Sequence, residues 1–205
     1  MGVLTPAEVP LVQIGDVLSG RSRDEKVRVR GWLYTRRSSG GIAFLVIRDG
    51  TGWLQCVARR EALGEEKLEE LEDLPVESVI ELVGSIREDP RAPGGRELRI
   101  EAYKVISLAE QGFPIAKKYH GPDFLLEKRH LWIRSKKMWS ILMVRAKLLK
   151  AAREWLEEHG FVEAHAPILT ASACEGGATL FPVDYFGQKA YLTQSWQLYG
   201  EALIA

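Results

Sequence analysis

Residues 36–57 read RRSSGGIAFLVIRDGTGWLQCV, and this stretch decides the fold of the first half of the chain. It holds two short segments, residues 42–47 and 53–57, that are rich in the β-branched, aliphatic and aromatic residues typical of strands. Turn residues bound both segments, with Gly40-Gly41 before the first and Asp49-Gly50 between the two. The stretch therefore predicts two neighbouring strands joined by a tight turn.

Further strands are predicted on either side of this pair. Residues 27–33 alternate apolar and polar side chains, which is the pattern of a half-buried strand. Residues 61–74 predict a helix, with leucines on one side and glutamates elsewhere, and residues 79–86 and 97–106 predict two more strands. Three strands, a helix and two strands follow the order of an OB-fold, a small Greek-key barrel. Other small barrels fit the pattern almost as well.

The second half of the chain has a different character. Residues 111–123 contain glycines and prolines without a clear period, which indicates a linker. A long amphipathic helix follows, with Ile141, Val144, Leu148, Ala152 and Trp155 at helical spacing, and Gly160 is expected to end it. We then expect a short strand at residues 161–164 and a hairpin of residues 181–186 and 190–193. The last nine residues, 197–205, resemble a helix without a stop signal, which suggests a truncated or split protein.

Composition excludes several classes of protein. The formal net charge is +0, so the chain has no bulk basicity, although seven Lys and Arg residues crowd into residues 21–37. That cluster is compatible with one basic face for a polyanion. No apolar run is long enough to cross a membrane and no secretory signal precedes the fold, so we expect a cytoplasmic protein. The two cysteines lie far apart without histidines at ligand spacing, so we expect no metal site.

Three side chains near the opening stretch are candidates for binding nucleic acid. Period-two alternation sends Ala43, Leu45, Ile47, Leu54 and Cys56 to the barrel interior. The remaining positions, Phe44 and Gln55, then point outward on neighbouring strands. An aromatic ring can stack on a base and an amide can pair with its edge, while Arg37 can add a phosphate contact or a stack.

The same stretch, RRSSGGIAFLVIRD followed by GWLQ, resembles the anticodon-binding domain of the aspartyl, asparaginyl and lysyl group of class II aminoacyl-tRNA synthetases. The later segment GFVEAHAPILT, residues 160–170, is similar to motif 1 of that class. Residues 174–181, 184–186 and 191–199, which read CEGGATLF, DYF and YLTQSWQLY, match the amino-acid-binding stretch of the aspartyl and asparaginyl enzymes. The resemblance covers the chain from about residue 27 to its end.

The resemblance implies roles for individual residues. Glu175 would bind the α-ammonium group of the amino acid from a loop that Gly176-Gly177 allows to close, and Ser195 and Gln197 would line the pocket. Motif 1 would form a homodimer interface, with Pro167 close to the partner's active site. Aspartyl enzymes carry a lysine at the position of Gly200. Its replacement by glycine, followed by Glu201, favours a neutral amide substrate over a carboxylate.

The expected fold is thus an OB-fold barrel at residues 1–108, a linker at 109–133, and an incomplete α/β class II catalytic domain with an antiparallel sheet at 134–205. The implied function is the ATP- and Mg2+-dependent attachment of asparagine to tRNA. The chain lacks motifs 2 and 3 with their ATP-binding arginines, so no catalytic site is complete and we expect the chain alone to be inactive. The alternatives are an aspartyl enzyme that charges both tRNA(Asp) and tRNA(Asn), an asparagine synthetase related to this catalytic fold, and a non-catalytic tRNA-binding fragment.

Overall fold

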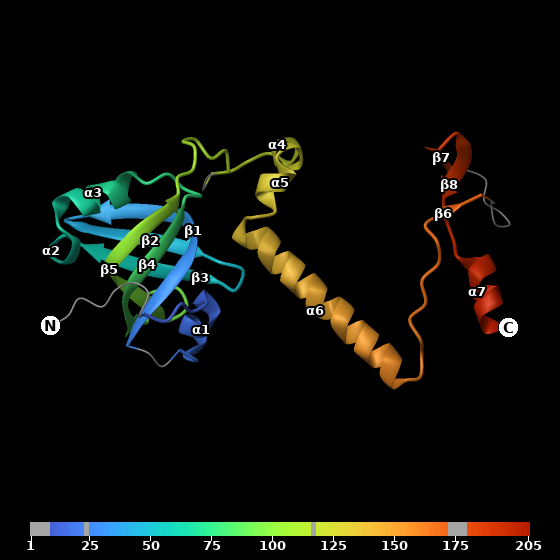
Figure 1. Cartoon of the computed structure of the whole chain (residues 1–205), viewed down its shortest axis with the longest axis horizontal. Coiled ribbons are helices and arrows are strands. Elements are labelled where there is room, and N and C mark those ends of the chain that lie inside the picture. The colour runs from blue at the N-terminus through green and yellow to red at the C-terminus, as the bar shows by residue number, and fades with distance from the viewer. Residues whose placement is uncertain (1–8, 23–24, 116–117, 172–179) are drawn as a thin grey trace. The chain divides into compact units, whose positions relative to one another are not determined.

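A computed structural model of the chain describes residues 9–22, 25–115, 118–171 and 180–205. The chain divides into two compact units, residues 1–120 and 121–205, and each is described by itself. This division leaves the finer boundaries of the predicted linker untested. Unit 1 contains the following helices and strands (Figure 1): α1 Ile14–Ser19, β1 Lys26–Ser39, β2 Ile42–Arg48, β3 Trp53–Arg59, α2 Arg60–Leu63, α3 Glu65–Asp73, β4 Val79–Glu88 and β5 Arg96–Ser107.

The five strands of unit 1 form a closed barrel in the order β1-β2-β3-β5-β4, with β4 pairing back to β1. All pairs are antiparallel except β3 with β5. This is the strand order of an OB-fold, so the predicted fold of the first half is confirmed. The interior is filled by the buried apolar side chains that alternation predicted, namely Ala43, Leu45, Ile47, Leu54 and Cys56. Apolar residues from β1, β4 and β5 complete the core.

Two features of unit 1 differ from the sequence-based prediction. The helix expected at residues 61–74 is two helices, α2 and α3, because Gly64 between them has a φ of 84° and cannot continue a right-handed helix. Leu68 and Leu71 of α3 are nevertheless buried as expected. Strand β1 is longer than residues 27–33 and carries an irregularity between Leu33 and Thr35, which bends it around the barrel.

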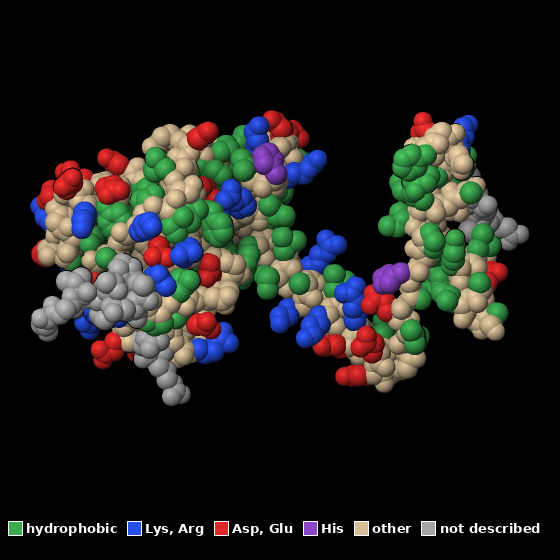
Figure 2. Space-filling view, in the orientation of Figure 1, with side chains coloured by type: hydrophobic (Ala, Val, Ile, Leu, Met, Phe, Trp, Pro, Cys, Tyr) green, Lys and Arg blue, Asp and Glu red, His purple; other side chains and the backbone are tan. Residues whose placement is uncertain are grey.

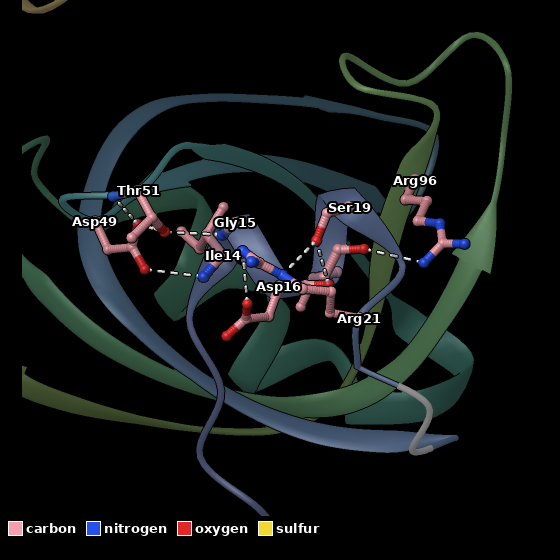
Figure 3. Close-up of polar contacts among 9 residues, drawn as sticks. Ile14, Gly15, Asp16, Ser19, Arg21, Asp49, Thr51 and Arg96 are labelled. Carbon is pink, nitrogen blue, oxygen red and sulfur yellow. Dashed lines mark hydrogen bonds and ion pairs between the residues drawn. The ribbon is translucent and has the colours of Figure 1, made fainter. Parts of the chain in front are cut away.

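A short helix that the sequence did not predict, α1, docks on the barrel. Its residues Ile14 and Val17 are fully buried in the core. Two side chains between β2 and β3 accept hydrogen bonds from the start of this helix. Ile14 N–H donates to Oδ2 of Asp49 at 2.9 Å, and Gly15 N–H donates to Oγ1 of Thr51 at 2.8 Å (Figure 3). At the other end, Nη1 of Arg96 donates to the carbonyl of Val17 at 3.1 Å. Side chains of the barrel thus satisfy polar groups at both helix ends.

Unit 2 contains four helices and three strands among its described residues, and they are α4 Pro122–Glu127, α5 Arg129–Trp132, α6 Lys136–Glu158, β6 Leu169–Thr170, β7 Phe181–Tyr185, β8 Gln188–Leu192 and α7 Gln197–Ile204. The strands make an antiparallel sheet in the order β6-β8-β7. An antiparallel sheet and the final helix agree with the prediction. The two short helices α4 and α5 lie in residues that were predicted to be a linker.

The long helix α6 ends where the sequence predicted, at Gly160, and its start at Lys136 is capped by Ser135. Oγ of Ser135 accepts a hydrogen bond from Met138 N–H at 3.3 Å, which caps the first turn. At the other end Gly160 N–H donates to Glu157, and Phe161 N–H donates to Leu156 at 3.0 Å, which is the Schellman arrangement. The strand predicted at residues 161–164 is wrong, because these residues pair with no strand among the described residues and a strand requires a hydrogen-bonded neighbour.

Candidate nucleic-acid interface and amino-acid pocket

Arg37 and Phe44 form a pair on the outer face of the barrel. They lie directly opposite each other in the β1–β2 ladder, and the guanidinium carbon of Arg37 lies 4.6 Å from the centre of the Phe44 ring. This is a cation–π contact between a cation and an aromatic face. Arg37 is exposed and Phe44 is half-buried, so ring and guanidinium form a surface on which a base can stack.

Gln55 lies on the adjacent strand, diagonally across from Phe44. Phe44 is opposite Val57 and Gln55 is opposite Val46, so both side chains point away from the core on neighbouring strands. Nε2 of Gln55 donates to Oε2 of Glu97 at 3.1 Å. This bond directs the amide nitrogen toward Glu97, which leaves the carbonyl oxygen of Gln55 as the atom that can accept a hydrogen bond from a base.

Glu97 lies at the floor of this face. Glu97 is only 7% exposed, and it lies opposite Gln55 in the parallel β3–β5 ladder. Beneath the face, burial raises the pKa of the Cys56 thiol well above its ordinary value, and the negative charge of Glu97 raises it further. Cys56 is therefore a core residue rather than a nucleophile or a metal ligand. The other cysteine, Cys174, lies outside the described residues.

The basic cluster at residues 21–37 does not form one basic face. Nη2 of Arg30 lies 2.6 Å from Oε2 of the buried Glu81 on β4, and Nη1 of Arg28 lies 3.8 Å from the same carboxylate. Lys26 pairs with Glu101 at 2.6 Å. These cations are matched by acids of β4 and β5. Figure 2 shows Lys and Arg interspersed with Asp and Glu over the visible face of unit 1. Arg37, stacked on Phe44, is the member of the cluster that supports the predicted interface.

The predicted amino-acid-binding residues of unit 2 gather around the start of α7. Thr193 donates its hydroxyl hydrogen to the carbonyl of Ser195, which shapes the turn into the helix. Within the first turns, Nε2 of Gln197 donates to Oε1 of Glu201 at 3.2 Å, an i,i+4 pair on the exposed side of α7. The structure thus joins Gln197 to Glu201, and Ser195 lies in the turn that leads into α7. Glu175 lies outside the described residues, and Pro167 is exposed just before β6.

Trp196 and Gly200 form a contact that the sequence did not predict. Trp196 is the N-cap residue of α7, and its carbonyl accepts from Gly200 N–H at 2.8 Å. A Cβ atom placed on Gly200 would lie 2.8 Å from Cζ3 and 3.0 Å from Cε3 of the indole. The indole therefore occupies the space into which a side chain at position 200 would grow.

Comparison with known families agrees with this geometry. Residues 27–106 match the family model of the OB-fold nucleic acid binding domain, and residues 121–205 match that of the class II tRNA synthetases (D, K and N). The chain thus joins an OB-fold domain to a segment that matches part of the class II tRNA synthetase model.

Individual proteins and solved structures that resemble the chain are more specific than the family models. The chain is 48% identical over 183 residues to asparagine–tRNA ligase of Pelotomaculum thermopropionicum, covering 89% of this chain and 42% of that protein. The crystal structure of asparaginyl-tRNA synthetase from Pyrococcus horikoshii, complexed with asparaginyl-adenylate, is 41% identical with a TM-score of 0.80, and the match covers 100% of this chain and 45% of that one. Aspartyl-tRNA synthetase from Entamoeba histolytica, at 21% identity and a TM-score of 0.67 over 82% of this chain and 41% of that one, shares the fold.

The chain spans less than half the length of these relatives. Among the described residues, no helix has the length and apolar character that spanning a membrane requires.

Proposed function

We propose that this chain is the N-terminal part of an asparagine–tRNA ligase, in which unit 1 binds the tRNA anticodon and unit 2 binds asparagine. The observation that carries the proposal is the union of two features in one chain. The Arg37–Phe44 stack with Gln55 beside it offers a base a ring and an acceptor. Unit 2, in turn, resembles synthetases named for asparagine over its whole length.

On the barrel, Phe44 stacks on an anticodon base and the carbonyl oxygen of Gln55 accepts a hydrogen bond from its edge. Arg37 stacks behind Phe44 and adds positive charge near the phosphate backbone. A stacked base is worth about 1–3 kcal/mol in proteins that bind single strands. This is enough for one contact to govern affinity for an unpaired loop.

In unit 2, Glu175 binds the α-ammonium group of asparagine through a charge-assisted hydrogen bond, and Ser195 and Gln197 line the pocket. Glu201 offers an acceptor to the side-chain amide of asparagine and repels the carboxylate of aspartate. Position 200 supports this selectivity, because Gly200 lies against the Trp196 indole and has no room for the cation that an aspartate carboxylate would need.

The reaction is activation of the asparagine carboxylate by ATP with Mg2+, followed by transfer to the tRNA end. The Pyrococcus relative was crystallised with asparaginyl-adenylate, which is consistent with ATP use. The described residues of this chain contain no cluster of three or more His, Cys, Asp or Glu that could hold a metal ion. We assign ATP and Mg2+ to the complete protein. This chain contributes recognition and positioning of the substrates.

We also propose that the protein is a homodimer formed through α6 and the segment up to Thr170, and that it acts in the cytoplasm. Apolar residues at helical spacing on α6 are exposed, among them Val144 and Leu148, each 68% exposed. A helix with such a stripe is stabilised by packing against a partner.

The test of the proposal is substrate-dependent ATP–pyrophosphate exchange and tRNA charging by the complete protein. We expect exchange with asparagine and not aspartate, and charging of tRNA(Asn) and not tRNA(Asp). The 205-residue chain is expected to bind tRNA(Asn) without exchange activity. Charging of both tRNAs with aspartate would identify an aspartyl enzyme of relaxed specificity. Binding of tRNA without activity in the complete protein would identify a non-catalytic tRNA-binding protein.

A further inference from the structure

Helix α7 has one buried residue, and that residue is a glycine. Gly200 is shielded by the indole of Trp196, four positions earlier, whereas Trp196 itself is 48% exposed. The three nearest atoms to a Cβ built on Gly200 all belong to this indole, at 2.8, 3.0 and 3.3 Å. Residues four apart on a helix lie one above the other, so the N-cap ring covers the bare backbone of the second turn.

This contact offsets a weakness of the helix. Glycine inside a helix is unfavourable relative to alanine because its backbone loses more freedom on folding. Helix α7 has only eight residues, which is too short to be stable by propensity alone. An aromatic ring packed on Gly200 removes its backbone from water and restricts the first turn. The indole can pack here only because position 200 has no side chain, and the backbone of Gly200 is in turn covered by the indole.

We propose that Trp196 is a positioning residue of the amino-acid pocket, which acts by packing its indole on Gly200 and thereby fixing the first turn of α7. The proposal rests on the asparagine-binding function proposed above. The first turns of α7 carry Gln197 and Glu201, which are hydrogen-bonded to each other at 3.2 Å. Both residues belong to the proposed pocket, so loosening this turn changes where their amide and carboxylate groups lie.

The same packing couples the two positions during substitution. A Cβ at position 200 meets the indole at a distance that real contacts do not allow, so Gly200→Ala must displace the ring or the turn. Once the ring is removed by Trp196→Ala, the same alanine meets no indole and strengthens the helix. The effect of Gly200→Ala therefore changes sign with the residue at position 196.

The experiment measures kcat/KM for asparagine in ATP–pyrophosphate exchange by the complete protein. We expect each single variant, Trp196→Ala and Gly200→Ala, to lower kcat/KM about fivefold, because each one removes or displaces the indole that fixes the first turn. The loss should appear mainly in KM for asparagine, with KM for ATP unchanged. The double variant should have a higher kcat/KM for asparagine than Trp196→Ala. Trp196→Phe should retain most of the wild-type kcat/KM because it keeps a ring over Gly200.

A second measurement does not depend on enzymatic activity. Hydrogen exchange of residues 196–205 in the 205-residue chain should be faster in Trp196→Ala and slower again in the double variant. The control is Phe186→Ala, which removes an exposed aromatic ring from the β7–β8 turn and should leave the α7 exchange rates unchanged.

The two proposals fail in distinguishable ways. Wild-type protein without asparagine-dependent exchange would overturn the proposed function, and the hydrogen-exchange result would still decide the role of Trp196. An active wild type in which the two substitutions act additively on both kcat/KM and α7 exchange would overturn the positioning role alone.

Discussion

Oδ2 of Asp49 accepts a hydrogen bond from the backbone N–H of Ile14 at 2.9 Å and so joins the β2–β3 turn to a helix 35 positions earlier in the chain. The other carboxylate oxygen accepts from Thr51 and Gly52 within the turn itself. One side chain therefore fixes both the turn and the start of α1. Helix α1 in turn places Ile14 and Val17 in the barrel core.

Replacing Asp49 should consequently destabilise unit 1. Asp49→Ala leaves the Ile14 N–H without its acceptor, and we expect a loss of about 1–3 kcal/mol in the free energy of unfolding. Urea unfolding of the 205-residue chain measures this. Glu101→Ala is the matched control, because its ion pair with Lys26 is exposed on both sides and should contribute less than about 1 kcal/mol. Equal losses in the two variants would contradict the capping role.

Removing the proposed stacking ring should weaken tRNA binding. Phe44→Ala is expected to reduce the affinity of the chain for tRNA(Asn) by about 1–3 kcal/mol at constant salt. Arg37→Ala should reduce the affinity and also lower the slope of log affinity against log salt by roughly 0.7–0.9, since one phosphate charge is no longer neutralised. Arg91→Ala, at an exposed turn, is the control for loss of an arginine. Unchanged affinity in Phe44→Ala would remove the anticodon role.

The apolar stripe of α6 should mediate self-association. Leu148→Glu places a charge in a stripe that is proposed to be buried between two copies, so we expect the sedimentation mass to fall from dimer to monomer. Lys150→Ala, on the opposite side of the helix, should leave the mass unchanged. A monomeric wild-type chain, or a dimer that survives Leu148→Glu, would contradict an α6 interface.

Glu201 should determine the choice between asparagine and aspartate. In the complete protein, Glu201→Gln removes the charge that repels aspartate and exchanges an acceptor for an amide that can also donate. We expect kcat/KM for asparagine to fall sharply and discrimination against aspartate to shrink. Glu154→Gln, which changes a carboxylate on α6, should alter neither. Wild-type constants for both amino acids in Glu201→Gln would show that Glu201 is not the specificity residue.

Tyr103 should give the stability of unit 1 a dependence on alkaline pH. Its hydroxyl donates to Glu70 and also lies 3.1 Å from the carbonyl of Lys67, which ties α3 to β5. Burial, followed by the hydrogen bond to Glu70 and its charge, raises the pKa of Tyr103 above its ordinary value of 10.0.

A raised folded-state pKa means that the folded protein holds this proton more tightly than the unfolded chain does. The stabilisation is therefore fully present below about pH 10 and is lost as the pH rises toward the folded-state pKa. Tyr103→Phe should cost about 1 kcal/mol of unfolding free energy at neutral pH, with a difference from wild type that shrinks above about pH 10. A difference that stays constant through that range would contradict this.

The outward placement of two candidate interface residues could be predicted from local pattern. Alternation along residues 42–57 correctly placed Phe44 and Gln55 on the outer face, because side chains of a strand point to opposite sides in turn. Ser195, Gln197 and Glu201 were assigned to the pocket through a resemblance to a family, and that assignment stays a prediction. The ion pairing of Arg28 and Arg30 with Glu81 was missed, since the partner is some fifty positions away and nothing in the basic segment indicates it.

By itself the sequence determined the features that depend on neighbours along the chain. These are the barrel strands with their inward and outward sides, and the end of α6 at Gly160. Only the tertiary structure decided whether α1 forms, because six residues cannot pay the cost of helix nucleation until Asp49 and Arg96 bind its ends. The tertiary structure likewise decided where the indole of Trp196 packs. Its contact with the backbone of Gly200 exists only once α7 has formed, and it depends on the space at position 200, which a pattern of residue types does not indicate.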